Sequence, residues 1–202
     1  MIVSRLSKQG KYKVTVEIDG SYAFFLYQKD LKKLMLQEGD EISYKLVEEI
    51  HQLILFPRAK NKALSLLQCR SYTKKDMEQK LMRTGYPGAI IAQVMDFLNE
   101  YHFLNDEAYV RSYIEIQGQR KSRLQMQQEL QMKGISKGLF CQIWEEQPED
   151  KEEMTLRQQL EKRIRAKGPV TSENFQKYYA FFMRKGYHSS MILSLLKEYK
   201  NV

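Results

Sequence analysis

Three cations within four residues form the cluster in this sequence that most suggests binding chemistry. Arg120 and Lys121 precede Ser122, Arg123 follows it at an expected helix start, and no acidic residue lies within three positions on either side. A cationic helix start opposes the helix dipole by about 0.3 kcal/mol, so folding alone does not favour this arrangement. The cluster suits an anionic partner, either DNA or an acidic protein surface. The alternative is a solvated turn that only keeps the protein soluble.

Other candidate contacts are basic side chains at helix starts or along helix faces. Lys74 and Lys75 open an expected helix, although Asp76 follows them at once. The remaining candidates are Arg111, Arg157, Lys162, Arg163 and Arg165. Residues 1–56 carry eight basic and eight acidic side chains, so the formal net charge of +8 lies in residues 57–202. Such an excess favours polyanions or acidic protein surfaces as partners.

Patterns typical of catalysis or cofactor binding are absent from the sequence. It has no phosphate-binding glycine loop, no dinucleotide-binding fingerprint and no paired-cysteine metal motif. Its histidines share no local motif, and Cys69 and Cys141 are so far apart that two reduced core thiols are favoured over a disulfide. We therefore predict no enzyme activity, no catalytic residues, no cofactor, no metal and no small-molecule substrate.

Targeting signals are also missing. No apolar run approaches the ~18 residues that a membrane span needs, and the first residues lack the apolar core of a signal peptide. The sequence predicts a cytoplasmic protein that makes no membrane contact.

Three copies of one helical pattern organise most of the chain. The copies align on Gly85, Gly134 and Gly186, at intervals of 49 and 52 residues. Twelve residues before each glycine stands an N-cap type, namely Thr73, Ser122 and Asn174. Each glycine suits a left-handed helix end, and the apolar residue after it suits the hydrophobic contact of a Schellman motif. Three copies in register argue for an array of similar helical units.

Before these repeats the sequence has strand periodicity. Apolar and polar residues alternate over 13–18, Asp19-Gly20 signals a hairpin, and residues 22–27 supply an aromatic second strand. Residues 2–6 suggest a third strand and residues 28–36 a short helix. So small a sheet must dock on other elements, and we favour capping of the helical array over a binding role. Because Phe24 and Phe25 point to opposite faces, at least one belongs to the core, which limits base stacking by the sheet.

The expected fold is mainly α, with tandem three-helix repeats and a small N-terminal β region. The predicted divisions are a β region (1–42), a connecting helix (43–56), and three three-helix repeats (57–104, 105–148 and 149–202). Pro57 is expected to interrupt the helical pattern in the first turn of the next helix.

The chain resembles the RecX family, regulators of the RecA recombinase in bacteria. The matching residues are RSYTKKDM at 70–77, FLNDEAYVRSY at 103–113 and, best of all, KSRLQMQQELQMKGI at 121–135. The likeness is clear from about residue 60 to 143 and moderate in the third repeat, which has no Ser or Thr cap in register and a Gly-Pro break. The N-terminal sheet region looks like an extension that some family members carry.

The resemblance implies tandem three-helix units in a curved, elongated array. It also implies that such an array binds the RecA–DNA filament along its groove. It implies restraint of ATP hydrolysis, strand exchange and coprotease activity, and hence a role in DNA repair and the SOS response. It also implies weak direct binding of single- or double-stranded DNA, and it carries over no catalytic or ligand residue. Two hypotheses remain: a regulator of a recombinase filament, and a stand-alone basic DNA-binding helical repeat protein. Salt dependence separates them, because a binder of phosphates alone loses affinity steeply as salt rises.

Overall fold

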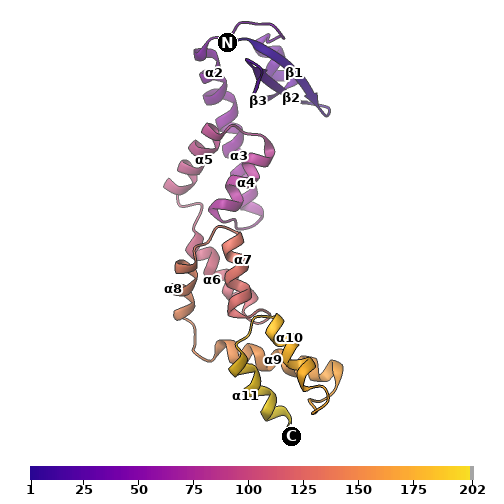
Figure 1. The fold of residues 1–202 in the computed structure, drawn as a ribbon. Helices are drawn as coiled ribbons and strands as arrows, with labels where there is room; N and C mark the ends of the chain where they lie inside the picture. The colour runs from indigo at the N-terminus through magenta and orange to yellow at the C-terminus, as the bar shows by residue number, and fades with distance from the viewer. Residues whose placement is uncertain (201–202) are drawn as a thin grey trace. The chain divides into compact units, whose positions relative to one another are not determined.

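The structure is a computed structural model that describes residues 1–200 and separates into two compact units. The first is Met1–Leu104, and the second begins at Asn105 (Figure 1). We call these the N-terminal unit and the C-terminal unit. The prediction of a mainly α-helical chain with a small antiparallel sheet near its N-terminus is confirmed. Among the described helices, none has both the length and the apolar character needed to cross a membrane.

The sheet has three antiparallel strands in chain order. They are β1 (Val3–Gln9), β2 (Lys13–Ile18) and β3 (Ser21–Tyr27), and the short helix α1 (Gln28–Leu34) follows. Asp19 and Gly20 join β2 to β3 with φ values of 49° and 78°. Both values are positive, as a two-residue hairpin turn of the favoured handedness requires, so the Asp-Gly signal is confirmed.

Both faces of the sheet are covered. Phe24 is 0% exposed and meets the edge of His51, with ring centroids 5.7 Å apart, while Phe25 is 1% exposed and lies 5.1 Å from the ring of Tyr86. The sheet and the helices of the N-terminal unit share one apolar core. The sheet therefore docks as expected, and neither phenylalanine is available to stack on a base.

Polar contacts complete this docking at the carboxyl end of a helix. Lys13 Nζ donates a hydrogen bond of 2.6 Å to the carbonyl of Thr84, and the hydroxyl of Tyr22 donates to the carbonyl of Gly85. The last carbonyls of a helix have no partner within the helix. The sheet thus closes the end of the helix in which Thr84 lies.

The helix break expected at Pro57 does not occur. The helices α2 (Tyr44–Ile50), η1 (His51–Leu55) and α3 (Phe56–Cys69) run on without interruption. In η1, a π-helical turn, the Phe56 N–H bonds to the carbonyl of His51, five residues earlier. Because proline has no N–H to give, the wider turn just before it accommodates the missing bond while the backbone stays helical. Pro57 does lie in the first turn of α3, as predicted.

From α3 onward, the described helices follow in groups of three, and α3 belongs to the first group. The N-terminal unit adds α4 (Lys74–Thr84) and α5 (Gly88–Glu100). The C-terminal unit contains α6 (Asp106–Gln117), α7 (Arg123–Met132), α8 (Lys137–Glu145), α9 (Lys151–Lys167), α10 (Phe175–Arg184) and α11 (Ser189–Lys200). Helices α6–α8 surround one apolar cluster, and α9–α11 surround another. The finer predicted division of the chain into repeats stays a prediction.

Two of the three repeat caps have the predicted bond. Thr73 accepts from the N–H of Asp76 at 3.1 Å, and Ser122 accepts from the N–H of Gln125 at 3.2 Å. Asn174 is the N-cap residue of α10 as predicted, but the predicted bond is wrong, because its side chain accepts from Thr171 N–H at 2.8 Å, before the helix, and makes no cap bond. An asparagine can bond to nearby backbone in more than one direction, and here the upstream turn competes successfully.

All three repeat glycines end their helices as predicted. Gly85, Gly134 and Gly186 have φ values of 95°, 86° and 79°. The N–H groups of Tyr86, Ile135 and Tyr187 bond to the carbonyls of Leu81, Leu130 and Phe182 at 3.4, 3.0 and 3.3 Å. These are the bonds that close a Schellman motif.

Within the C-terminal unit, the end of α10 packs on the start of α7. The Ser122 hydroxyl donates to the carbonyl of Lys185 at 2.6 Å, in addition to capping α7. A Cβ at Gly186 would lie 3.1 Å from Ser122 Oγ and 3.2 Å from Leu124 Cβ. Glycine is therefore required here both by its positive φ and by close approach.

Candidate nucleic-acid and partner interface

The basic turn before α7 is less exposed than its sequence indicates. Lys121 Nζ bonds to Glu129 Oε2 at 2.5 Å and to the Tyr113 hydroxyl at 3.1 Å. Burial would lower the pKa of Lys121, but these hydrogen bonds outweigh it and raise that pKa. Glu129 therefore neutralises one of the three cations, although it lies eight residues from Lys121 and outside the three-residue window in which the sequence shows no acid.

Arg123 is also engaged within the fold. Its backbone N–H donates to Glu152 Oε1 at 2.9 Å, so a carboxylate from α9 lies at the positive end of the α7 dipole. Its guanidinium carbon lies 5.8 Å from the ring centroid of Trp144, within cation–π range. Folding thus explains part of an arrangement that looked unfavourable in sequence. Of the three clustered cations, only Arg120 is exposed.

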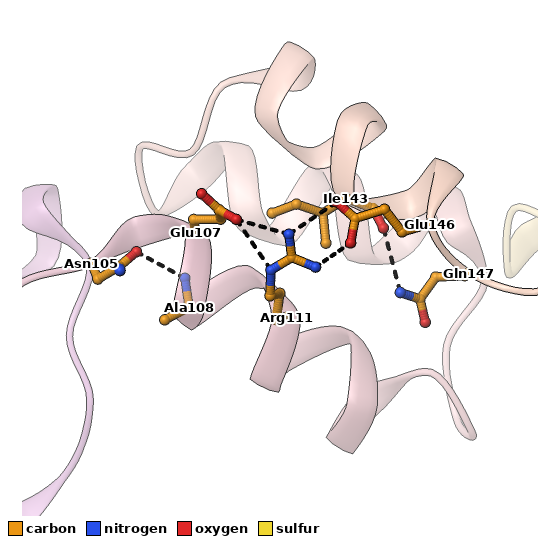
Figure 2. Close-up of polar contacts among 7 residues, drawn as sticks. All are labelled: Asn105, Glu107, Ala108, Arg111, Ile143, Glu146 and Gln147. Carbon is orange, nitrogen blue, oxygen red and sulfur yellow. Dashed lines mark hydrogen bonds and ion pairs between the residues drawn. The ribbon is translucent and has the colours of Figure 1, made fainter.

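Arg111 is held between two carboxylates. Figure 2 shows its guanidinium facing Glu107 on the same helix and Glu146 just after α8. Nη2 lies 2.8 Å from Glu107 Oε1 and 2.9 Å from Glu146 Oε1, and Nη1 also bonds to Glu146. The hydrogen bonds to Glu146 and then Glu107 raise the pKa of Arg111. Glu107 and Glu146 neutralise the charge of Arg111, so this side chain mainly links α6 to the end of α8.

Two more candidates form ion pairs on the third repeat. Arg157 lies 3.0 Å from Glu198 and 3.4 Å from Glu153. Arg165 lies 3.8 Å from Glu161, with 78% of its side chain exposed. Such exposed pairs contribute little to stability and can rearrange when a partner binds. In the N-terminal unit, Lys74 and Lys75 are both exposed in the first turn of α4.

The other two predicted residues, Lys162 and Arg163, lie together in a basic hollow of about 280 Å³ between α9 and α10. We call it the α9–α10 pocket. Its lining residues are Gln159, Lys162, Arg163, Ala166, Lys167, Phe181 and Lys185. The sequence showed Lys167 on this helix but did not single it out, although its i, i+4 relation to Arg163 was readable. Lys185 was missed, because it comes from another helix and only the fold brings it here.

The histidines, cysteines and carboxylates of the described residues form no metal-binding cluster. Within residues 1–200, no three His, Cys, Asp or Glu side chains come together as metal ligands would. Both cysteines are free, and Cys69 is exposed, so the expectation of a core position for it is wrong. Cys69 is the last residue of α3, and its neighbours Gln68 and Arg70 are exposed as well.

Similarity to known proteins agrees with this architecture. The family models "RecX, first three-helix domain" and "RecX, second three-helix domain" match residues 59–98 and 105–139. A crystal structure of a regulatory protein RecX aligns with a TM-score of 0.64 at 21% identity, covering 98% of each chain. RecX from Lactobacillus salivarius aligns with the same TM-score at 19% identity, covering 73% of this chain and 97% of its own. These structural likenesses concern the fold.

Sequence relatives decide the family. A Regulatory protein RecX of Clostridium tetani is 28% identical over 196 residues, which cover 96% of this chain and 91% of the relative. That of Caldanaerobacter subterraneus subsp. tengcongensis is 31% identical over 166 residues, covering 81% and 84%. With such identity over most of both chains, and with both RecX domain models matching its helical repeats, this chain belongs to the RecX family of regulatory proteins.

Proposed function

We propose that this chain binds the RecA–DNA filament of its host and inhibits ATP hydrolysis and strand exchange by the recombinase. It acts there as a cytoplasmic regulator and not as an enzyme. Membership of a family of regulatory proteins carries the proposal. The partner is a polyanion coated with protein, which is consistent with the placement of the whole net charge of +8 in residues 57–202.

The exposed cations that remain after internal pairing support a contact through several separated patches. Arg120, Lys75 and the α9–α10 pocket are exposed to solvent, whereas Lys121 and Arg111 are bonded to carboxylates within the fold. A filament repeats its own charges along its length. Separated patches on a chain of small helical units suit such a surface better than one deep cleft would.

The decisive experiment measures ATPase of the host recombinase on single-stranded DNA, with the chain added after filaments have assembled. The proposal expects turnover to fall as the chain is added. Unchanged turnover, at chain concentrations that co-sediment with the filament, would refute it. Excess free single-stranded DNA serves as the control, since it relieves inhibition that arises only from sequestered DNA.

The second candidate function, stand-alone DNA binding, is favoured by one observation, the α9–α10 pocket. It predicts tight binding to naked DNA with a salt slope near −0.9 per contacted phosphate on duplex and about −0.7 on single strands. A filament regulator instead needs the recombinase for tight binding. Comparing affinity for naked DNA and for the assembled filament at one salt concentration separates the two functions.

A further inference from the structure

The α9–α10 pocket gathers four cations around a hollow with no acidic side chain in its lining. Lys162 and Lys167 are exposed at its rim, and Arg163 and Lys185 are half-buried. The acid nearest in sequence, Glu161, is engaged elsewhere, since it accepts from the Tyr199 hydroxyl at 2.8 Å. Like charges held together without counter-charges repel one another. An anion bound in the pocket would offset this repulsion.

The two half-buried cations are held in place by uncharged groups. The Arg163 guanidinium carbon lies 3.7 Å from the ring centroid of Phe181, and its Nε is buried with no hydrogen-bond partner among the described residues. Lys185 Nζ donates to Gln159 Oε1 at 2.5 Å. Burial and then the nearby charge of Arg163 lower the pKa of Lys185. Both cations are therefore positioned without being neutralised.

We propose that the α9–α10 pocket binds a backbone phosphate of nucleic acid. A phosphodiester offers several charged oxygens to cations that converge from two helices, and a planar guanidinium matches phosphate geometry well. The hollow, of about 280 Å³, is open to solvent and leaves room for a phosphate group between the four cations. The apolar ring of Phe181 in the wall suits a sugar or base beside that phosphate, because single-strand binders combine cations with aromatic rings.

The test uses the full chain and a short fluorescein-labelled oligothymidine, with a labelled duplex as a parallel arm. Lys162→Gln/Lys167→Gln removes two rim cations, and Lys137→Gln/Lys197→Gln removes two exposed lysines of the same unit, on α8 and α11, which contribute no residue to the lining of the pocket. We expect the pocket variant to flatten the salt slope by about 1.4 on the single strand or about 1.8 on the duplex. On the single strand, the wild-type chain then loses about sevenfold more affinity than the pocket variant between ~50 and ~200 mM salt. Equal slopes for the pocket and control variants on both arms would overturn the proposal.

A second measurement reports on the pocket itself. Acylation of Lys185 by an amine-reactive reagent, read by peptide mass spectrometry, should slow severalfold when the oligonucleotide is bound, because a bound phosphate covers the amine and favours its protonated form. Acylation of Lys137, which is exposed on α8, should not change. If an oligoglutamate peptide protects Lys185 and neither oligonucleotide does, the pocket takes acidic peptides and the proposal is wrong. Neither measurement contains recombinase, so this inference and the proposed filament regulation can fail separately.

Discussion

Ser122 connects two helical repeats through one hydroxyl, and its removal should cost more than the loss of an ordinary helix cap. The side chain accepts from the N–H of Gln125 and donates to the carbonyl of Lys185. It is 0% exposed, so water cannot readily replace either bond after Ser122→Ala. Ser136 is the matched control, because it also caps a helix, accepting from Leu139 N–H at 3.2 Å, but is exposed.

The magnitudes follow from the two bonds. Loss of an N-cap costs about 0.5–2 kcal/mol, and loss of a further hydrogen bond costs about 0.5–1.5 kcal/mol. Ser122→Ala should therefore lower the free energy of unfolding by about 1–3.5 kcal/mol, and Ser136→Ala by about 0.5–2 kcal/mol. The expected difference between the two variants is about 1 kcal/mol and belongs to the bond with Lys185.

The single tryptophan provides the assay. Trp144 lies on α8 in the C-terminal unit, so its fluorescence during urea titration of the full chain follows that unit even if the two units unfold separately. With a urea slope of about 2 kcal/mol per M, a difference of about 1 kcal/mol separates the midpoints of the two variants by about 0.5 M. If Ser122→Ala and Ser136→Ala shift the midpoint equally, the bond between the repeats contributes nothing and the reasoning fails.

Three further predictions concern single positions. Gly85→Val should destabilise the chain by about 1 kcal/mol or more, because φ is 95° there, and a denaturation midpoint equal to wild type would contradict this. Asp30, on α1, accepts two hydrogen bonds from the Arg58 guanidinium, at 2.6 and 2.7 Å. Burial alone would raise the pKa of Asp30, but the hydrogen bonds from Arg58 and from the backbone N–H of Tyr27 outweigh it and lower that pKa below 3.8. The stabilisation of about 1.5–3 kcal/mol that Asp30→Asn removes at neutral pH should therefore be complete above this unfolded value and vanish as pH falls through the lower folded pKa. A stability difference between wild type and Asp30→Asn that persists in acid would argue against the pair. Lys121→Glu should destabilise the chain, because it places a second carboxylate beside Glu129. Arg120→Glu should change the free energy of unfolding by less than about 0.5 kcal/mol, and it should still weaken inhibition of recombinase ATPase at low salt. Equal stability of these two variants in urea would show that the internal pair is unimportant.

Local features of the fold were readable because they depend on few neighbouring residues. A threonine or serine cap, a glycine at a left-handed helix end and an Asp-Gly hairpin each depend on backbone geometry within about one helical turn. Thr73, Gly134 and Asp19 were predicted correctly for this reason. Asn174 shows the limit, because two local bonds compete for one side chain and the sequence does not state which is stronger.

Pairing of charges was decided by tertiary structure. Lys121 looked unpaired because its partner lies eight residues along the chain, and Arg111 is shared between its own helix and the end of α8. An ion pair forms where side chains converge in space, at distances of a few ångströms that sequence separation does not reveal. A list of cations in the sequence therefore overstates the charge available to a partner.

The sequence by itself determined the helical repeats, the caps at Thr73 and Ser122, and the sign of the charge on the helical part of the chain, since these follow from periodicity, cap residue type and composition. Only the tertiary structure decided which cations remain exposed and which are paired within the fold. Arg163 and Lys185 are 22 residues apart, on a helix and at the end of the next one, and they meet because those helices pack through Leu160 and Phe182. The physical reason is that burial of apolar faces sets the positions of helices, and the polar side chains come together where that packing places them.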